Sequence, residues 1–253
     1  MFEPGFDQAS GLRRMVVPHT GGELGLMAFP LAPDMPAQWI ARLAHALRAL
    51  GARPVVIDAG RDAALSHALG LDLAFDLLDW LHGAASFDAV AGVTPDGVHV
   101  LRAEQGIEAF VASGAPARQL FGALAQMTHG FDVALLAMPA GELACMADPL
   151  CAVPVLPLEH GEQGLVRTYS TLKHLAEGFG YHRFALVGCD DDSPAPQRDL
   201  RDHHRIAGIA RTYLNAEVSL AGTLPVDGHG APAGLARLAG TLISTAATPC
   251  SLH

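Results

Sequence analysis

The stretch from Leu26 to Asp58 constrains the fold most, because it holds a strand, a helix and a second strand in one short span. Leu26–Phe29 is apolar, Pro36–Leu50 has the pattern of a helix closed by a glycine, and Pro54–Asp58 is apolar again. This order forms a βαβ unit, whose two strands run parallel, and we expect them to be neighbours in the sheet. The stretch therefore indicates an α/β protein.

The loop after the first strand, Pro30–Met35, is where such a unit can bind an anion, because it opens onto a helix N-terminus. A phosphate loop needs glycines, a lysine, and a serine or threonine for Mg²⁺. This loop has none of these; it has prolines, which offer no N–H group, and Asp34, which repels phosphate. We expect a structural connection in which Asp34 caps the helix and Pro36 stands near its first position.

Strands and helices alternate over the rest of the chain. The further segments expected to be strands are Val98–Leu101, Val133–Met138, Cys151–Leu156, Phe184–Val187 and Glu217–Leu224. The further helices are expected at Ala63–Leu69, Ala74–His82, Ala117–Thr128, Gln163–Glu177, Gln197–Leu214 and Ala233–Thr245. Val133–Met138 is apolar on both faces, as a central parallel strand must be, whereas the proline in Cys151–Leu156 indicates a distortion or an edge position. This alternation predicts a doubly wound α/β domain over residues 23–253, with a mostly parallel sheet flanked by helices.

Residues 1–22 are expected to form a separate short helix and linker. Phe6, Ala9 and Leu12 recur at three-residue steps, Asp7 stands near the start, and Arg13 stands near the end, where it complements the helix dipole. A helix this short is marginal alone in water. It is therefore either a frayed terminus or a recognition helix that orders on a partner.

Composition argues against several functions. A formal charge of −10 disfavours a nucleic-acid-binding surface. The chain has no apolar run of about 18 residues and no signal peptide, so we expect a cytoplasmic protein.

The four cysteines are far apart and are expected to be buried thiols. We expect no metal, because the 13 histidines lack ligand spacing and His203 and His204 would point about 100° apart on a helix.

Three acidic sites are candidates for chemistry. Asp58 ends a strand at the edge where ligands bind in α/β proteins, and Asp190–Asp192 could hold a hard cation. Neither has a partner base or nucleophile in the sequence, so a solvated loop is favoured for Asp190–Asp192. Asp132 is expected to be a cap or turn residue. The chain also lacks a nucleophile elbow.

Taken in order, these segments resemble the MinD/ParA-type P-loop ATPases. The resemblance covers roughly Leu26–Ala246 and rests on four stretches: Leu43–Ala59, Ala68–Leu71, Phe131–Gly141 and Gly222–Asp227. Within that superfamily, Asp7–Arg13 matches the D-Q-A-x-x-L-R motif in the N-terminal helix of the flagellar-number regulators called FlhG or FleN.

The resemblance implies a role for this helix. In the family it binds the flagellar GTPase FlhF and stimulates its GTP hydrolysis. Gln8 would then help to order the attacking water, as a glutamine does in other GTPase reactions. Asp7, Ala9, Leu12 and Arg13 would be docking residues.

The resemblance also places the family's nucleotide site on residues with different chemistry. The degenerate site is expected at Leu31, Pro36, Ala37, Asp58, Gly60 and Ala137. The first three stand where the family has two lysines and the hydroxyl for Mg²⁺. Asp58 is kept, whereas Gly60 and Ala137 stand where the family has acidic residues. These replacements predict a pseudo-ATPase without catalytic residues of its own and without ATP or Mg²⁺ as a cofactor.

The leading hypothesis is a non-catalytic FlhG-like regulator of flagellar number or placement. Its α/β domain would be a scaffold, and its N-terminal helix would act on the FlhF-type GTPase, with other flagellar or polar proteins as further partners. The last helix has only Arg237 as a basic residue, so no basic membrane-binding face is expected and a partner would recruit the protein to the pole or membrane. Two alternatives stay open: an ATPase with an unconventional nucleotide loop, and a MinD-like scaffold in cellulose secretion or septum placement.

Overall fold

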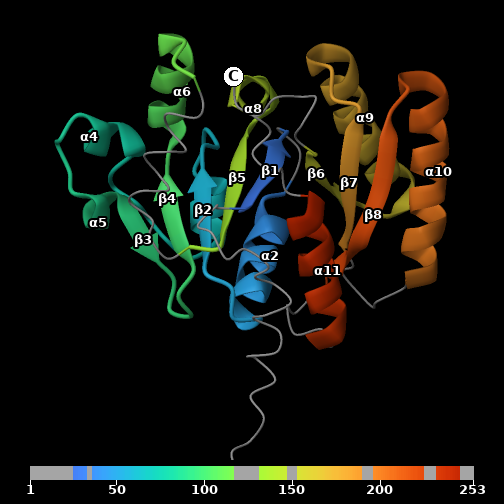
Figure 1. Ribbon diagram of the computed structural model, residues 1–253, viewed down its shortest axis with the longest axis horizontal. Coiled ribbons are helices and arrows are strands. Elements are labelled where there is room, and N and C mark those ends of the chain that lie inside the picture. Colours follow the sequence, from blue (N-terminus) through green and yellow to red (C-terminus); the bar gives the residue numbers. More distant parts are fainter. Residues whose placement is uncertain are drawn as a thin grey trace, which may run out of the picture.

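A central sheet with helices on both faces organises the protein in the computed structural model (Figure 1). The structure describes residues 25–32, 36–116, 131–146, 153–189, 196–224 and 232–245. The strands are β1 (Gly25–Leu31), β2 (Pro54–Asp58), β3 (Ala91–Val93), β4 (His99–Arg102), β5 (Val133–Pro139), β6 (Val155–Leu158), β7 (Arg183–Cys189) and β8 (Glu217–Leu224). The helices are α2 (Gln38–Ala49), α3 (Ala64–Ala68), α4 (Leu77–Leu81), α5 (Phe87–Val90), α6 (Glu104–Ser113), α8 (Ala140–Met146), α9 (Gly161–Phe179), α10 (Pro196–Leu214) and α11 (Pro232–Thr245).

The strands form two groups that meet at β1 and β6. One group has the order β1-β5-β2-β4-β3, and the other has the order β6-β7-β8. A parallel bridge between Ala28 of β1 and Pro154, just before β6, joins the groups. All strand pairs are parallel except β3 with β4. The expected mostly parallel sheet flanked by helices is confirmed.

The expectation that β1 and β2 are neighbours is wrong, because β5 lies between them. Ala134 of β5 pairs with Leu26 on one side and with Val55 on the other. The residues from Val133 to Met138 are at most 1% exposed. An entirely apolar strand buries most surface in the middle of a sheet, which is where β5 lies. β1 and β2 remain parallel to each other.

The proline expected to disturb the sixth strand does so. Pro154 makes one bridge to Ala28, and the pairing between β1 and β6 does not continue beyond it. Proline has no N–H group to donate to a strand ladder, so a strand begins or ends its pairing there. β6 therefore starts at Val155 and is the edge of its three-stranded group.

Alternate residues of β5 enter different apolar cores on the two faces of the sheet. Val133, Leu135 and Ala137 pack in the core that contains α2 and α11, which lie together in front of the sheet in Figure 1. Ala134, Leu136 and Met138 pack in the core that contains residues of α9 and α10. The two-residue period of a strand thus explains why no polar residue interrupts β5.

Several expected features lie outside the described residues. They are the N-terminal helix with Asp7, Gln8, Ala9, Leu12 and Arg13, the helix Ala117–Thr128, and the acidic run Asp190–Asp192. Among the residues that the structure describes, no helix is both long and apolar enough to span a bilayer.

Candidate functional site

The strand order proceeds in opposite directions on the two sides of the junction between β1 and β6. From β1 the order proceeds outward through β5, β2 and β4, whereas from β6 it proceeds outward through β7 and β8. In open α/β sheets, ligands bind outside the carboxyl ends of the strands at such a reversal point. This edge is therefore the candidate site.

Asp58, at the end of β2, is buried, and both its carboxylate oxygens accept hydrogen bonds from the turn that follows. Oδ1 accepts from the Gly60 N–H at 3.1 Å. Oδ2 accepts from the N–H of Ser66 in α3 at 2.8 Å and from its hydroxyl at 2.7 Å. The carboxylate is only 1% exposed, so these bonds compensate its removal from water. Asp58 thus fixes the start of α3 against the end of β2.

Three further positions of the expected nucleotide site surround Asp58. Leu31 ends β1, and a Cβ added to Gly60 would lie 3.0 Å from Leu31 Cδ1 and 3.1 Å from Asp58 Oδ1. Ala137 is paired with Phe29 on one side and Asp58 on the other, and its carbonyl accepts from the Ala59 N–H at 2.8 Å. The structure therefore brings Leu31, Asp58, Gly60 and Ala137 together and places an apolar side chain beside Gly60.

Pro36 and Ala37 precede α2, and the expected helix start is wrong. Ala37 is the N-cap, and its carbonyl accepts from the N–H groups of Ile40 and Ala41. The helix therefore begins at Gln38, after Pro36, and the expected cap, Asp34, lies outside the described residues. Ala37 has no side-chain acceptor, and the first turn has no acidic residue. Among the described residues, no side chain therefore caps the N-terminus of α2.

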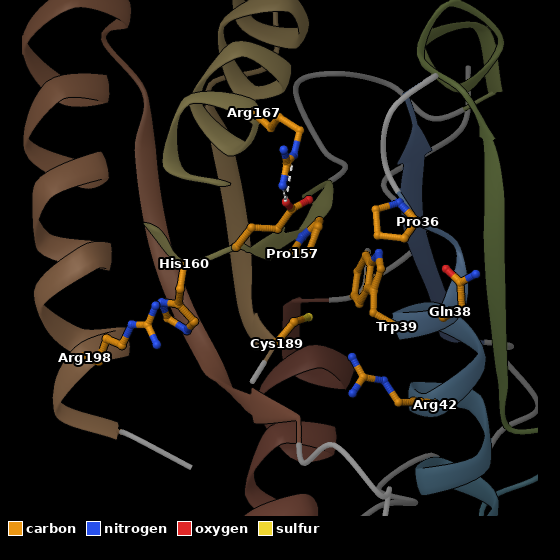
Figure 2. A pocket seen from close by; sticks show the side chains of 10 residues that line it. Pro36, Gln38, Trp39, Arg42, Pro157, His160, Arg167, Cys189 and Arg198 are labelled. Atoms are coloured by element: carbon orange, nitrogen blue, oxygen red, sulfur yellow. Dashed lines mark hydrogen bonds and ion pairs between the residues drawn. The ribbon is translucent and has the colours of Figure 1, made fainter. Parts of the chain in front are cut away.

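A pocket of about 660 Å³ lies beside this helix start (Figure 2). It is lined by Pro36, Gln38, Trp39, Arg42, Pro157, Glu159, His160, Arg167, Cys189 and Arg198. These residues come from both sides of the junction between β1 and β6, since α2 follows β1 and the others lie at β6 or beyond it. The volume is in the range of small-molecule sites, which is about 300–1,000 Å³.

His160 connects this pocket to a buried acidic pair on α10. Its Nδ1 hydrogen-bonds with Asp202 Oδ2 at 3.0 Å, and its Nε2 lies 2.7 Å from Asp199 Oδ1 in the geometry of an ion pair rather than of a directed hydrogen bond. Asp199 is fully buried and also accepts from the Thr223 hydroxyl. Because carboxylates face both ring nitrogens, His160 has no nitrogen available as a base toward the pocket.

Sequence reasoning missed this cluster and the pocket residues Trp39, Arg42 and Arg198. The one local signal was the spacing of Asp199 and Asp202, which places two carboxylates on the same side of a helix. His160 lies in a different segment, after β6, so only the packing of α10 beside β6 brings it to the two acids.

The Glu159–Arg167 pair shapes another wall of the pocket. The Arg167 Nε donates to Glu159 Oε2 at 2.8 Å, and a second guanidinium nitrogen contacts the same oxygen. The Thr168 hydroxyl donates to the Pro157 carbonyl at 3.0 Å. The first turns of α9 thus fix the loop that carries His160.

The chain has a single lysine, Lys173, so no neighbouring segment can supply a lysine side chain to the loop between β1 and α2. Lys173 lies on α9, with its Nζ 3.9 Å from Glu177 Oε2 one turn later.

Among the described residues, no group of three histidine, cysteine, aspartate or glutamate side chains is arranged to hold a metal ion. The His203 Nε2 instead lies 2.9 Å from the Val218 carbonyl oxygen.

Asp132 joins the opposite, amino-terminal ends of the strands. Its carboxylate accepts from the Arg53 backbone N–H at 2.9 Å and from the Arg53 guanidinium at 3.0 Å, and its carbonyl accepts from the Gly25 N–H. The hydrogen bond to Asp132 raises the pKa of Arg53. Asp132 thus links strand ends at a distance from the candidate site.

The expectation of buried thiols is wrong for Cys145. Of the two described cysteines, Cys145 is exposed and Cys189 is partly buried in the pocket wall. On α8, Leu143 and Met146 are the buried residues, which leaves Cys145 on the solvent side of the helix.

Glu142, on α8 directly after β5, should make stability depend on pH. Burial raises its pKa above the ordinary value of 4.5; Arg61 opposes this shift, and Glu108 and Glu104 add to it. Because the pKa of Glu142 is raised in the folded state, its contribution to the free energy of unfolding is fully present below pH 4.5. This contribution is lost as the pH rises through the folded-state pKa. We expect Glu142→Gln to melt at a higher temperature than the unmodified protein at pH 7 and at the same temperature at pH 4.

Melting temperatures measured between pH 4 and pH 8 test this expectation. The exposed Glu217→Gln is the control and should follow the unmodified protein at every pH. Parallel melting curves for Glu142→Gln and the unmodified protein across this range would contradict the assignment.

Comparisons with known proteins identify the fold. No family model matches the chain, and no curated protein matches its sequence. Among solved structures, it resembles MinD in the MinC:MinD cell division complex of Aquifex aeolicus, with 17% identity, a TM-score of 0.57, and 87% of this chain and 96% of that chain covered.

Two further solved structures agree. MinD of Aquifex aeolicus alone gives 17% identity, a TM-score of 0.56, and coverage of 88% and 98%. A Cyanothece McdA variant in complex with ATP gives 14% identity, a TM-score of 0.54, and coverage of 87% and 96%. At these identities the likeness shows the fold alone, which is the MinD-like α/β fold that the sequence predicts.

Proposed function

We propose that this protein is a non-catalytic regulator with a MinD-like fold that acts, as the FlhG proteins do, on an FlhF-type flagellar GTPase. Its α/β domain serves as a scaffold, and its N-terminal helix is the part that acts on the GTPase. The protein works in the cytoplasm and reaches the cell pole or membrane through a partner. It thereby regulates the number or placement of flagella.

The observation that best supports a domain without ATPase activity is the set of hydrogen bonds that Asp58 accepts. This carboxylate accepts hydrogen bonds from Gly60 and Ser66, which hold the turn after β2. Leu31 lies beside Gly60 where a lysine would be needed to neutralise phosphate charge, and Ala37 offers no hydroxyl for Mg²⁺. ATP hydrolysis requires these groups to act together, so their joint replacement supports a domain that does not hydrolyse ATP.

The sequence motif Asp7–Arg13 supports the GTPase half. Gln8 supplies the side chain that can orient an attacking water in phosphoryl transfer, while Asp7, Ala9, Leu12 and Arg13 dock the helix. This half does not depend on ATP binding by the α/β domain. GTP hydrolysis by the partner GTPase, with and without this chain, tests it.

Titration calorimetry with Mg-ATP tests the non-catalytic half. We expect no binding tighter than about 1 mM, because the loop between β1 and α2 has neither the lysine nor the glycines that hold phosphates. The formation of ADP from Mg-ATP should also stay at the background rate over hours. Grafting a single lysine, Leu31→Lys, should not restore hydrolysis, since Asp58 remains engaged with Ser66.

The pocket beside α2 favours a second candidate, an ATPase with an unconventional nucleotide loop. The pocket lies next to a helix N-terminus and is large enough for a nucleoside. Micromolar affinity for Mg-ATP in the same calorimetric experiment would favour this candidate and overturn the non-catalytic one.

A further inference from the structure

The pocket between α2 and α10 is lined by positive charge in an otherwise acidic protein. The chain carries a formal charge of −10, yet the charged side chains that line the pocket are Arg42, Arg167, Arg198 and a single carboxylate, Glu159. Glu159 is paired with Arg167, and the two acids behind the wall face His160. A cleft of opposite sign to the whole molecule concentrates ligands of the molecule's own sign.

Arg42 and Arg198 reach this pocket from opposite sides, Arg42 from α2 and Arg198 from α10 (Figure 2). Arg198 is exposed at the first turn of α10, and Arg42 lies one turn beyond the start of α2. Guanidinium groups bind carboxylates and phosphates through paired hydrogen bonds, so this arrangement suits an anion.

The helix start of α2 adds partial positive charge at the same place. No side chain of the described residues caps it, and its first turn contains no acidic residue. Pro36, Gln38 and Trp39, which make up this start, line the pocket. The dipole of α2 favours an anion at this end of the helix.

Trp39 provides an independent sign that a polar ligand belongs in the pocket. Its side chain is only 2% exposed, and its Nε1 has no hydrogen-bond partner among the described residues. Figure 2 shows this nitrogen at the end of the ring nearest to Pro36. The ring is held by an edge contact with Phe29, with 5.4 Å between ring centroids. A buried N–H without an acceptor is costly, and a bound ligand that accepts from it removes that cost.

We propose that this pocket binds a small organic anion, carrying a carboxylate or phosphate group, without magnesium. Arg42, Arg198 and the N-terminus of α2 supply the charge for the anionic group, and the Trp39 indole N–H donates to an acceptor on the same ligand. The apolar surfaces of Trp39, Pro36 and Pro157 contact its carbon skeleton. This inference goes beyond the proposed action on a GTPase and is tested independently of it.

Trp39 itself reports binding. The chain has two tryptophans, Trp39 and Trp80, so Trp80→Phe leaves Trp39 as the only tryptophan. Citrate is the carboxylate probe and glycerol 3-phosphate is the phosphate probe, each titrated in the presence of EDTA. We expect at least one of them to change the Trp39 emission with a Kd below about 1 mM.

Two arginine variants on the same helix separate a pocket effect from a general charge effect. Arg198→Gln should weaken binding about tenfold or more, because it removes a charged donor. Arg205→Gln removes an exposed arginine of α10 that does not line the pocket and should leave the Kd unchanged. Trp39→Phe, followed by calorimetry, should also weaken binding, since it keeps a ring beside Phe29 but removes the N–H.

Three results would overturn the proposal. The first is no emission change with either probe up to about 10 mM. The second is equal weakening by Arg198→Gln and Arg205→Gln, which would reveal only screening of surface charge. The third is binding of Mg-ATP but of neither probe, abolished by EDTA, which would identify the pocket as a nucleotide site. None of these results bears on whether the N-terminal helix stimulates a GTPase.

Discussion

Asp199→Ala is expected to lower the free energy of unfolding by about 3 kcal/mol, because it leaves buried polar groups without the carboxylate that they face. Asp199 is fully buried, with one oxygen 2.7 Å from His160 Nε2 and the other accepting from the Thr223 hydroxyl. The alanine would leave His160 and Thr223 without this partner and would open a gap beside Gly188. A Cβ on that glycine would lie 2.7 Å from Asp199 Cγ, which shows how closely the carboxylate approaches β7.

Urea unfolding measures this effect, and Asp202→Ala is the matched control. Asp202 shares the same histidine but is 8% exposed and also meets Arg201, 3.6 Å away, which is largely solvent-exposed. We expect a loss of about 1–2 kcal/mol for Asp202→Ala, since water can reach the groups left behind. Equal losses for the two variants, or a loss below 1 kcal/mol for Asp199→Ala, would contradict the view that Asp199 anchors the cluster.

The order of the strands shows what local sequence can and cannot predict. The apolar run Val133–Met138 predicts a strand buried on both faces, and β5 is one. Its insertion between β1 and β2 pairs segments that are far apart in the sequence, and no local pattern encodes that pairing. The same limit explains why the antiparallel strand β3 was not predicted.

Helix α6 was not predicted because its N-terminal cap comes from another segment. Ala103 is the N-cap residue and offers no side-chain acceptor. Asp76 Oδ1 instead accepts from the Gly106 N–H at 2.8 Å, and its Oδ2 accepts from the Gln105 N–H at 3.2 Å. Asp76 also caps α4 through the Leu78 N–H. One carboxylate thus starts two helices, and only the local one can be recognised from the sequence.

The candidate site divides in the same way. Asp58 at the carboxyl edge of the sheet could be placed from the pattern of β2 alone, and the replaced loop residues Leu31, Pro36 and Ala37 could be placed from the resemblance. The hydrogen bonds from Ser66 to Asp58 and the approach of His160 to Asp199 required the fold. Contacts between segments far apart in the sequence leave no periodic signal, so these parts of the site emerged only from the structure.

Loss of Gln8 is the second large effect that we expect. If Gln8 orders the attacking water in the partner GTPase, Gln8→Ala should abolish stimulation while the docking residues Asp7, Leu12 and Arg13 keep the complex intact. A stimulation of about tenfold corresponds to about 1.4 kcal/mol of barrier, a reasonable contribution from one positioned side chain. Ser10→Ala is the control, because Ser10 occupies a variable position of the motif and should not matter.

The most direct test of the account is the GTP hydrolysis rate of the FlhF-type GTPase from the same organism, measured with this protein and without ATP. The account predicts stimulation of about tenfold or more by the unmodified chain and by Ser10→Ala, and none by Gln8→Ala. An unchanged rate with the unmodified chain, although the two proteins bind, would contradict the proposed action on the GTPase. Stimulation that survives Gln8→Ala would contradict the role of that residue.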